Sequence, residues 1–332
     1  MTHIVFIADA GPDVGGGHVM RSVTLAQAMI ARGADCVFAE RPGVAAVLSA
    51  FAPDLGLTRD ATHADAVVFD HYGLEVHDHL SLAQGRPVLV IDDLADRFLG
   101  GDMVLDAGPA RKEADYRGLT AEGTRLLLGP MYAPVRPEFA AVRDGTLARR
   151  QAGGAVHRIL VSLGLGDLDG ISARVVRRLL PRAGAARIDV VLGEGALSHA
   201  WLQQAAAADP RLSIHVNSNR MAALTAGAEA AIGAGGSSTW ERCVLGLPSI
   251  LLVLAPNQRP AARAMADQGA ALVVDTSSPT FEASLDEAVG MLLADAALRA
   301  RLTEASAKVC DGLGAGRVAD AFLRLIAGRS PS

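Results

Sequence analysis

The chain has 332 residues, of which 50% are hydrophobic and 20% are charged, and its formal net charge is −5. This composition indicates a globular protein with room for two domains and argues against intrinsic disorder. The sequence has no long basic run, so we expect no binding to nucleic acid. The three cysteines, Cys36, Cys243 and Cys310, have no CxxC spacing. This argues against a thiolate metal site and favours buried thiols in a reducing compartment.

The N-terminus has no basic segment of the kind that begins a signal peptide. The longest charge-free run, Cys243–Gln258, is interrupted by Pro248 and Pro256 and is too short to span a bilayer. We therefore expect no integral membrane segment and a cytoplasmic protein.

The first half of the chain alternates short apolar runs with helical patterns. The predicted strands are Ile4–Ala8, Asp35–Ala39, Ala66–Phe69, Val88–Ile91, Met103–Leu105 and Leu126–Leu128. The predicted helices lie near residues 18–32, 42–52, 73–83 and 136–149. Continuous Val, Ile and Leu runs indicate a parallel sheet that is covered on both faces.

Residues 143–156 are polar and rich in glycine, which is typical of a linker, and we interpret Arg149-Arg150 as part of it or as a solvated helix face. The pattern of strands and helices then restarts. The predicted strands are Ile159–Leu163, Ile188–Leu192, Leu212–Val216, Ala230–Ile232, Ile250–Leu254 and Ala271–Val274. The predicted helices lie near 171–182, 196–207, 219–226, 237–246, 258–268, 281–293, 295–308 and 317–326.

These patterns predict an α/β protein of two Rossmann-like, doubly wound parallel-sheet lobes that face each other across a cleft. The first lobe is predicted at 1–150 and the second at 156–332, with a last helix able to pack back on the first lobe. Ligands of such sheets bind at the carboxyl ends of the strands, so the loops that follow the strands are the candidate sites.

The first candidate is the turn Gly15–His18, between the first strand and the first helix. Its glycines let a ligand approach the backbone, and a neutral histidine there can act as a general base. A capping or otherwise satisfied histidine is an equally good interpretation. Asp9, at the end of the first strand, could bond to His18 and fix its tautomer, or it could cap the turn.

Carboxylates end two further strands, at Asp70-His71-Tyr72 and at Asp92-Asp93. Adjacent carboxylates suggest a metal or acid–base site. However, neighbours on a strand point to opposite faces, so we expect only one of Asp92 and Asp93 to face the cleft.

The second candidate is the run Gly233–Glu241, which follows a strand and opens a helix. Bare backbone N–H groups and hydroxyls at Gly235, Gly236, Ser237 and Ser238 suit a diphosphate, and Glu241 could reach a ribose diol. A glycine-rich turn with Ser/Thr caps is the alternative. For the loops Gly164–Asp167 and Ala255–Gln258, ligand contacts and plain caps are equally good interpretations.

Seven motifs occur in one order: Asp9, Gly15–Ala26, Asp70–Tyr72, Val90–Ala95, Leu128–Phe139, Ile232–Cys243 and Leu254–Gln258. Two lobes with these turns resemble the two-lobed GT-B nucleotide-sugar enzymes. The whole series, from about residue 3 to 275, resembles the UDP-2,4-diacetamido-2,4,6-trideoxy-β-L-altropyranose hydrolases of pseudaminic acid biosynthesis. The chain departs from that family's pattern at Ile7, Leu165 and Ala107.

The resemblance implies a hydrolase that needs no metal or other cofactor and that releases UDP and the free sugar. Water would attack the anomeric carbon with inversion, and His18 would be the general base. The resemblance implies UDP contacts at Gly164, Met221, Gly235, Gly236, Ser237, Ser238 and Glu241. It implies sugar-side roles for Asp9, Gly16, Gly17, Arg21, Tyr72, Asn257 and Gln258. A GT-B glycosyltransferase with a hydroxyl acceptor is the alternative, and a non-catalytic nucleotide-sugar-binding protein is a third hypothesis.

Overall fold

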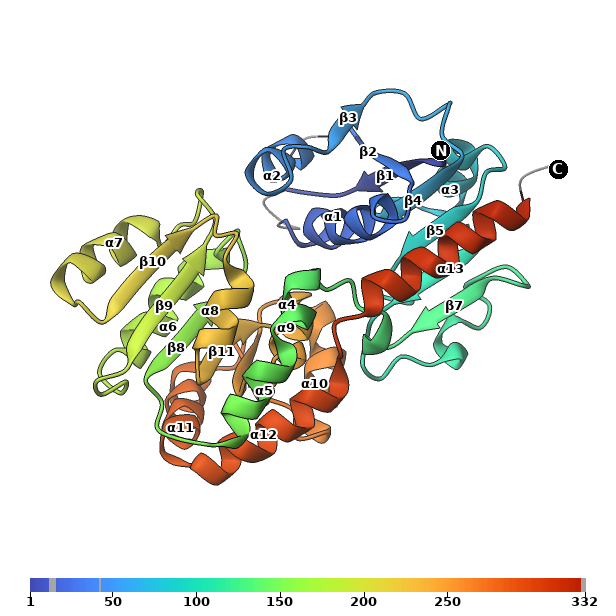
Figure 1. Cartoon of the computed structure of the whole chain (residues 1–332). Coiled ribbons are helices and arrows are strands. Elements are labelled where there is room, and N and C mark those ends of the chain that lie inside the picture. Colours follow the sequence, from blue (N-terminus) through green and yellow to red (C-terminus); the bar gives the residue numbers. More distant parts are fainter. Residues whose placement is uncertain (12–15, 42, 330–332) are drawn as a thin grey trace. The chain divides into compact units, whose positions relative to one another are not determined.

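The computed structural model describes residues 1–11, 16–41 and 43–329 (Figure 1). The chain forms two compact units, one of residues 1–136 with the C-terminal segment from Leu313, and the other of residues 137–312. The boundary between the two units therefore lies between residues 136 and 137, whereas the sequence predicted that the first lobe ends at residue 150. The C-terminal segment returns to the first unit, as the sequence allowed.

The first unit contains a parallel sheet in the order β3-β2-β1-β4-β5-β6-β7. Its strands are β1 (His3–Ala8), β2 (Asp35–Ala39), β3 (Gly56–Thr58), β4 (Ala66–Asp70), β5 (Val88–Ile91), β6 (Met103–Asp106) and β7 (Arg125–Leu128). Its helices are α1 (Gly17–Ile30), α2 (Val44–Phe51), α3 (Val76–Ala83) and α13 (Gly314–Arg329), with 3₁₀ turns η1 (Glu113–Tyr116) and η2 (Pro130–Tyr132).

The second unit contains a parallel sheet in the order β10-β9-β8-β11-β12-β13. Its strands are β8 (Arg158–Ser162), β9 (Arg187–Leu192), β10 (Leu212–Val216), β11 (Ala230–Ala234), β12 (Ser249–Val253) and β13 (Leu272–Asp275). Its helices are α4 (Pro137–Ala141), α5 (Arg143–Gln151), α6 (Ile171–Leu179), α7 (His199–Ala208), α8 (Met221–Gly227), α9 (Ser238–Val244), α10 (Arg259–Asp267), α11 (Phe281–Ala294) and α12 (Ala296–Val309). Its 3₁₀ turns are η3 (Leu168–Gly170) and η4 (Pro256–Gln258).

Each sheet has the strand order of a doubly wound fold, so the prediction of two Rossmann-like lobes is confirmed. In such sheets the direction of winding reverses between two adjacent strands, which leaves a crevice at their carboxyl ends. These strands are β1 and β4 in the first unit and β8 and β11 in the second. The loops after these strands are therefore the places where the fold favours ligand binding.

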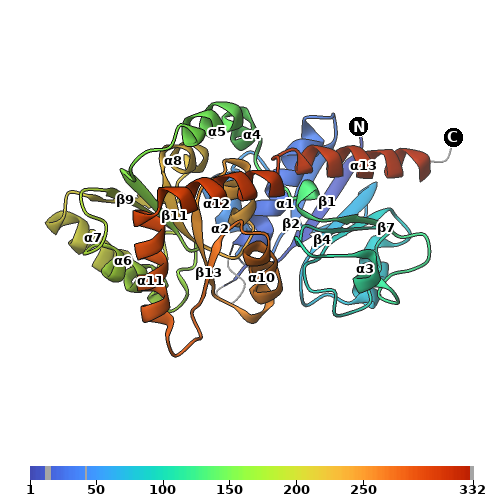
Figure 2. The ribbon, with the colours of Figure 1, turned by 90° about the horizontal axis from the view of Figure 1, so that it is seen from below.

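Strand β1 shows why the apolar runs are continuous. Ile4 and Phe6 belong to a core on one face of the sheet, while Val5 and Ile7 belong to a core on the other. Helix α13 contributes Phe322 to the first of these cores and packs against α1 (Figure 2). Both faces are buried, so an alternating pattern would leave polar side chains in a core.

The expected linker is wrong in its first part, because Arg143–Gln151 forms helix α5. Arg150 donates to the carbonyl oxygens of Thr225, Ala228 and Leu245, at 2.6–2.8 Å. Burial lowers the pKa of Arg150 to about 10. Arg149 also donates to a carbonyl, that of Ala226. Arg150 therefore caps the ends of neighbouring helices, whereas Arg149 is exposed on α5, as the interpretation of a solvated helix face predicted.

Among the residues that the structure describes, no helix is long and apolar enough to cross a membrane. Cys36, Cys243 and Cys310 are free and buried, as the sequence predicted.

Candidate functional site

His18 lies in the first turn of α1, directly after the loop that follows β1, and is 5% exposed. Its Nδ1 is hydrogen-bonded to Oδ1 of Asp70, the last residue of β4. β1 and β4 are the adjacent strands at which the first sheet reverses its winding. The histidine is therefore held at the position where this fold most often binds a ligand.

Asp70 fixes the orientation of the His18 ring. Burial opposes ionisation of Asp70, but the Arg21 guanidinium and His18 outweigh it and hold the pKa of Asp70 well below its ordinary value. An ionised carboxylate can only accept hydrogen bonds, so the proton of a neutral His18 ring resides on Nδ1. The Nε2 lone pair of that ring is then available to accept a proton.

Arg21 links Asp70 to a second carboxylate. It donates to Asp70 from Nε at 2.7 Å and from Nη2 at 2.6 Å, and Nη1 donates to Asp93 Oδ2 at 3.0 Å. The Tyr72 hydroxyl donates to Asp93 Oδ1 at 2.7 Å, and the Tyr72 ring meets the His18 ring edge-on at 4.5 Å between centroids. Arg21 and Tyr72 were predicted as sugar-side contacts. In the structure the Arg21 guanidinium and the Tyr72 hydroxyl bond to the carboxylates beside His18.

Of the two interpretations of Asp9, the bond to His18 is wrong, because Asp70 is the partner of His18. In the register of β1 and β4, Ala8 lies opposite Asp70, so Asp9 points to the other face of the sheet. His71 alternates to that same face, and its Nε2 lies 3.8 Å from Asp9 Oδ2. Burial lowers the pKa of His71.

The adjacent carboxylates Asp92 and Asp93 have different partners, as alternation along a strand predicts. Asp92 is 2% exposed and accepts from Tyr116 Oη at 2.8 Å and from Arg97 Nη1 at 3.2 Å. The same Tyr116 hydroxyl lies 2.7 Å from Asp106 Oδ2, and burial raises the pKa of Asp106. No group of three or more His, Cys, Asp or Glu side chains in the described chain could hold a metal ion.

In the second unit, the loop after β11 presents free hydrogen-bond donors. The backbone N–H groups of Gly236 and Ser237 donate to no acceptor among the described residues. The Ser237 side chain does not cap α9, and its hydroxyl likewise has no partner there. A Cβ at Gly236 would meet no atom within 4 Å. This loop can therefore receive an anion without breaking an existing bond.

The structure brings Gln258 to this loop, but as a structural group. Its Oε1 accepts from the backbone N–H of Leu254 at 2.9 Å, and a Cβ at Gly235 would lie 3.1 Å from that oxygen. Gln258 is the N-cap residue of α10 but its side chain does not cap that helix; it holds the loop after β12 in place. Asn257 is exposed beside it, and Glu241 is half-buried in the first turn of α9.

Gly164 follows β8, next to β11 in the sheet, and has a φ of +97°, which favours glycine. Asp167 accepts from the backbone N–H groups of Ser172 and Ser198 and holds this loop in place. Met221 begins α8 and is 9% exposed. In the first unit, Gly16 is the N-cap of α1, and a Cβ at Gly17 would meet nothing within 4 Å. Gly15 of the predicted turn lies outside the described residues.

Sequence reasoning missed Arg242, Tyr116 and Asp106. Asp106 ends a predicted strand, as Asp70 and Asp92 do, so its position at the sheet edge could have been predicted. Tyr116 is buried and bonded to Asp92 and Asp106, and Arg242 is buried because it fills the space beside Gly233; no local pattern indicates either residue.

No protein-family model matches the chain. The chain is 24% identical over 334 residues to the spore coat polysaccharide biosynthesis protein SpsG of Bacillus subtilis (strain 168), covering 95% of this chain and 96% of that protein. Acinetobacter baumannii MurG has a similar structure, with a TM-score of 0.63 and 16% identity over 98% of this chain and 100% of its own.

Two further similar structures contain nucleotides. The spinosyn rhamnosyltransferase SpnG complexed with thymidine diphosphate has a TM-score of 0.64 and 16% identity, covering 98% of this chain and 100% of its own. S. aureus MnaA with UDP has a TM-score of 0.64 and 14% identity, covering 100% of this chain and 99% of its own. These matches show that the chain has two Rossmann-like lobes of the GT-B type.

Proposed function

We propose that this protein is an enzyme that transfers a sugar from a UDP-linked donor to a hydroxyl group, with His18 as general base. The observation that carries the proposal is the hydrogen bond between His18 Nδ1 and the buried, ionised Asp70. A base must be oriented and must have a free lone pair, and this bond provides for both.

The chemistry follows from the leaving group. A nucleoside diphosphate is a weak base, so its departure requires donors for the developing negative charge more than it requires an acid. The free N–H groups of Gly236 and Ser237 and the Ser237 hydroxyl are donors of that kind. The attacking oxygen must lose a proton, and His18 Nε2 is proposed to take it.

Transfer to a hydroxyl is favoured over hydrolysis by the proteins that resemble this chain. SpnG is named as a rhamnosyltransferase, and SpsG is named for polysaccharide biosynthesis. Both names are compatible with a sugar that is passed to another molecule. The donor in our proposal is UDP-linked because the motif series resembles UDP-sugar enzymes.

The second candidate is hydrolysis of a UDP-linked 2,4-diacetamido-2,4,6-trideoxyhexose, in pseudaminic acid biosynthesis. The order of the seven sequence motifs favours it. The same base would then deprotonate water, and inversion at the anomeric carbon would give the free sugar and UDP. The chemistry required of His18 is the same in both candidates.

The remaining residues have narrower proposed roles. Glu241 would bond to the ribose, Gly164 and Met221 would border the nucleoside, and Asn257 would contact the sugar. Gly16 and Gly17 would leave room for the sugar beside His18.

A panel of UDP-sugars tests the proposal, each with and without a set of hydroxyl acceptors. We expect release of UDP from at least one sugar, dependent on an acceptor. Release without an acceptor, with ¹⁸O from labelled water in the sugar, would establish the hydrolase instead. Label in UDP would mean cleavage of a P–O bond and would contradict both candidates. Absence of UDP release from the whole panel would also contradict both.

A further inference from the structure

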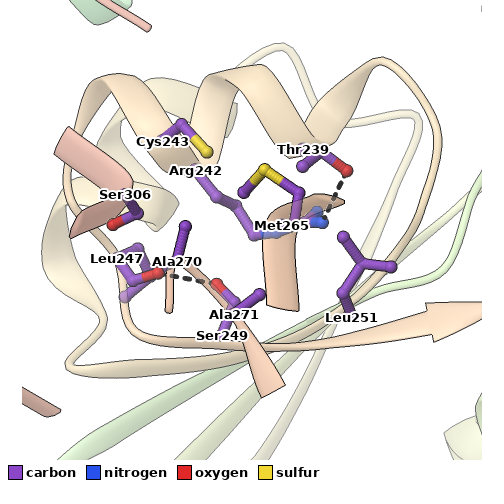
Figure 3. Close-up of a pocket in the computed structure, with 10 residues that line it drawn as sticks. All are labelled: Thr239, Arg242, Cys243, Leu247, Ser249, Leu251, Met265, Ala270, Ala271 and Ser306. Carbon is purple, nitrogen blue, oxygen red and sulfur yellow. Dashed lines mark hydrogen bonds between the residues drawn. The ribbon is translucent and has the colours of Figure 1, made fainter. Parts of the chain in front are cut away.

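Arg242 is a buried cation that braces the loop Gly235–Ser238 from both sides. It is 4% exposed. Its Nη2 donates to the Ala234 carbonyl oxygen at 2.8 Å and to Thr239 Oγ1 at 3.2 Å. Its Nη1 donates to Ser238 Oγ at 3.1 Å. In Figure 3 the side chain extends from α9 through a small pocket toward the Thr239 hydroxyl.

No carboxylate of the described chain forms an ion pair with this guanidinium; Glu241 acts on it electrostatically only from beyond ion-pair distance, and the Arg242 Nε has no hydrogen-bond partner there. Burial lowers the pKa of Arg242 to about 10, so the group is a cation at neutral pH. A buried charge without a counter-charge is costly, and proteins seldom retain one without a partner.

Gly233 makes this burial possible. A Cβ on Gly233 would overlap with Nη1 and Cζ of Arg242. The guanidinium therefore occupies the space that any other residue at 233 would fill. Because Gly233 lies within β11 with no left-handed φ, the backbone itself does not require glycine there.

We propose that Arg242 is a positioning residue that gives the Gly235–Ser238 loop an excess positive charge, and that the diphosphate of a nucleotide supplies the missing counter-charge. This inference rests on the proposed function, because it takes the ligand to be a nucleoside diphosphate. It explains why two residues of the motif Ile232–Cys243, Gly233 and Arg242, serve to bury a cation. It also makes the charge of the ligand, more than its base, the source of affinity at this loop.

The test compares binding of UDP and of uridine to the native protein and to Arg242→Met, by titration calorimetry. Uridine keeps the base and ribose and lacks the charge. We expect Arg242→Met to lower the affinity for UDP about tenfold or more, because it removes a nearby charge at low dielectric. The affinity for uridine should stay the same. Arg242→Lys, which keeps the charge but lacks the planar fork, should recover part of the UDP affinity.

Arg150→Met is the matched control, because Arg150 is a half-buried arginine of the second unit that caps helix carbonyls. It should lower stability and leave the ratio of UDP to uridine affinity unchanged. Equal loss of UDP and uridine affinity in Arg242→Met would show a merely structural role and overturn the inference, as would unchanged UDP affinity. If the native protein binds neither UDP, dTDP, GDP nor ADP, the proposed function fails together with this inference.

Discussion

Asp70→Asn removes the carboxylate that orients His18 while keeping its size. Asp70 accepts four hydrogen bonds, from His18 Nδ1, from Nε and Nη2 of Arg21, and from Ser22 Oγ. An asparagine oxygen has two lone pairs, so two of the four donors lose their acceptor. At about 1.5–3 kcal/mol for each of these two bonds to a charged group, we expect a loss of about 3–6 kcal/mol of stability.

The effect on turnover has a separate cause. The asparagine amide can donate to His18 Nδ1, which moves the ring proton to Nε2 and leaves no lone pair to accept a proton. General base catalysis is worth roughly 10²–10⁴-fold, so kcat should fall by about that factor. Urea denaturation measures the stability, and UDP release at saturating donor measures kcat in the fraction that remains folded.

Asp92→Asn is the matched control. Asp92 is a buried carboxylate at the end of the adjacent strand β5, bonded to Arg97 and Tyr116 and not to His18. The Asp92→Asn variant should be less stable than the native protein but keep a near-native kcat. If Asp70→Asn keeps kcat within about tenfold of the native value, or if Asp92→Asn loses as much, the assigned role of Asp70 is refuted.

Three further predictions concern other parts of the molecule. Ser237→Ala should weaken UDP binding by about 1 kcal/mol with unchanged Tm, since its hydroxyl has no partner in the described chain; a lower Tm with native affinity would contradict this. The buried His79 ring packs against Phe69, and burial lowers the pKa of His79 to about 4. The neutral form of His79 therefore stabilises the fold fully above about pH 6.5, and this stabilisation is lost as the pH falls toward 4. In His79→Asn the free energy of unfolding should therefore fall less between these two pH values, by up to about 3 kcal/mol. An unchanged slope would contradict the assignment of this pH dependence to His79. A chelator should leave turnover unchanged, because Asp92 and Asp93 are each bonded to an arginine; a loss that Mg²⁺ restores would point to a metal site there.

The strands could be predicted because a continuous apolar run of four to six residues in a doubly wound protein usually forms a strand that is buried on both faces. β3 was not, since Gly56–Thr58 is short, and Gly56 and Leu57 are exposed. The strand order explains the error at Asp9. Sequence proximity favours Asp9 as the partner of His18, whereas the adjacency of β1 and β4 brings Asp70 to it.

Arg242 and Arg150 show a limit of local patterns. Each belongs to a charged stretch that would be solvated on an isolated helix. Arg150 is half-buried and donates to carbonyl oxygens 75 to 95 positions away in the chain. Arg242 is buried because Gly233 has no side chain. Neither the carbonyl partners of Arg150 nor Gly233 lies within one helical turn of the arginine concerned, so a local sequence pattern does not indicate these contacts.

We propose that His18 removes a proton from the acceptor and does not serve to bind the nucleotide. The most direct measurement compares UDP release and UDP affinity in the native protein and in His18→Asn, with His79→Asn as a control for loss of a buried histidine. We expect His18→Asn to bind UDP with native affinity and to release less than about a hundredth of the native amount of UDP from the UDP-sugar. Native turnover in His18→Asn would contradict it.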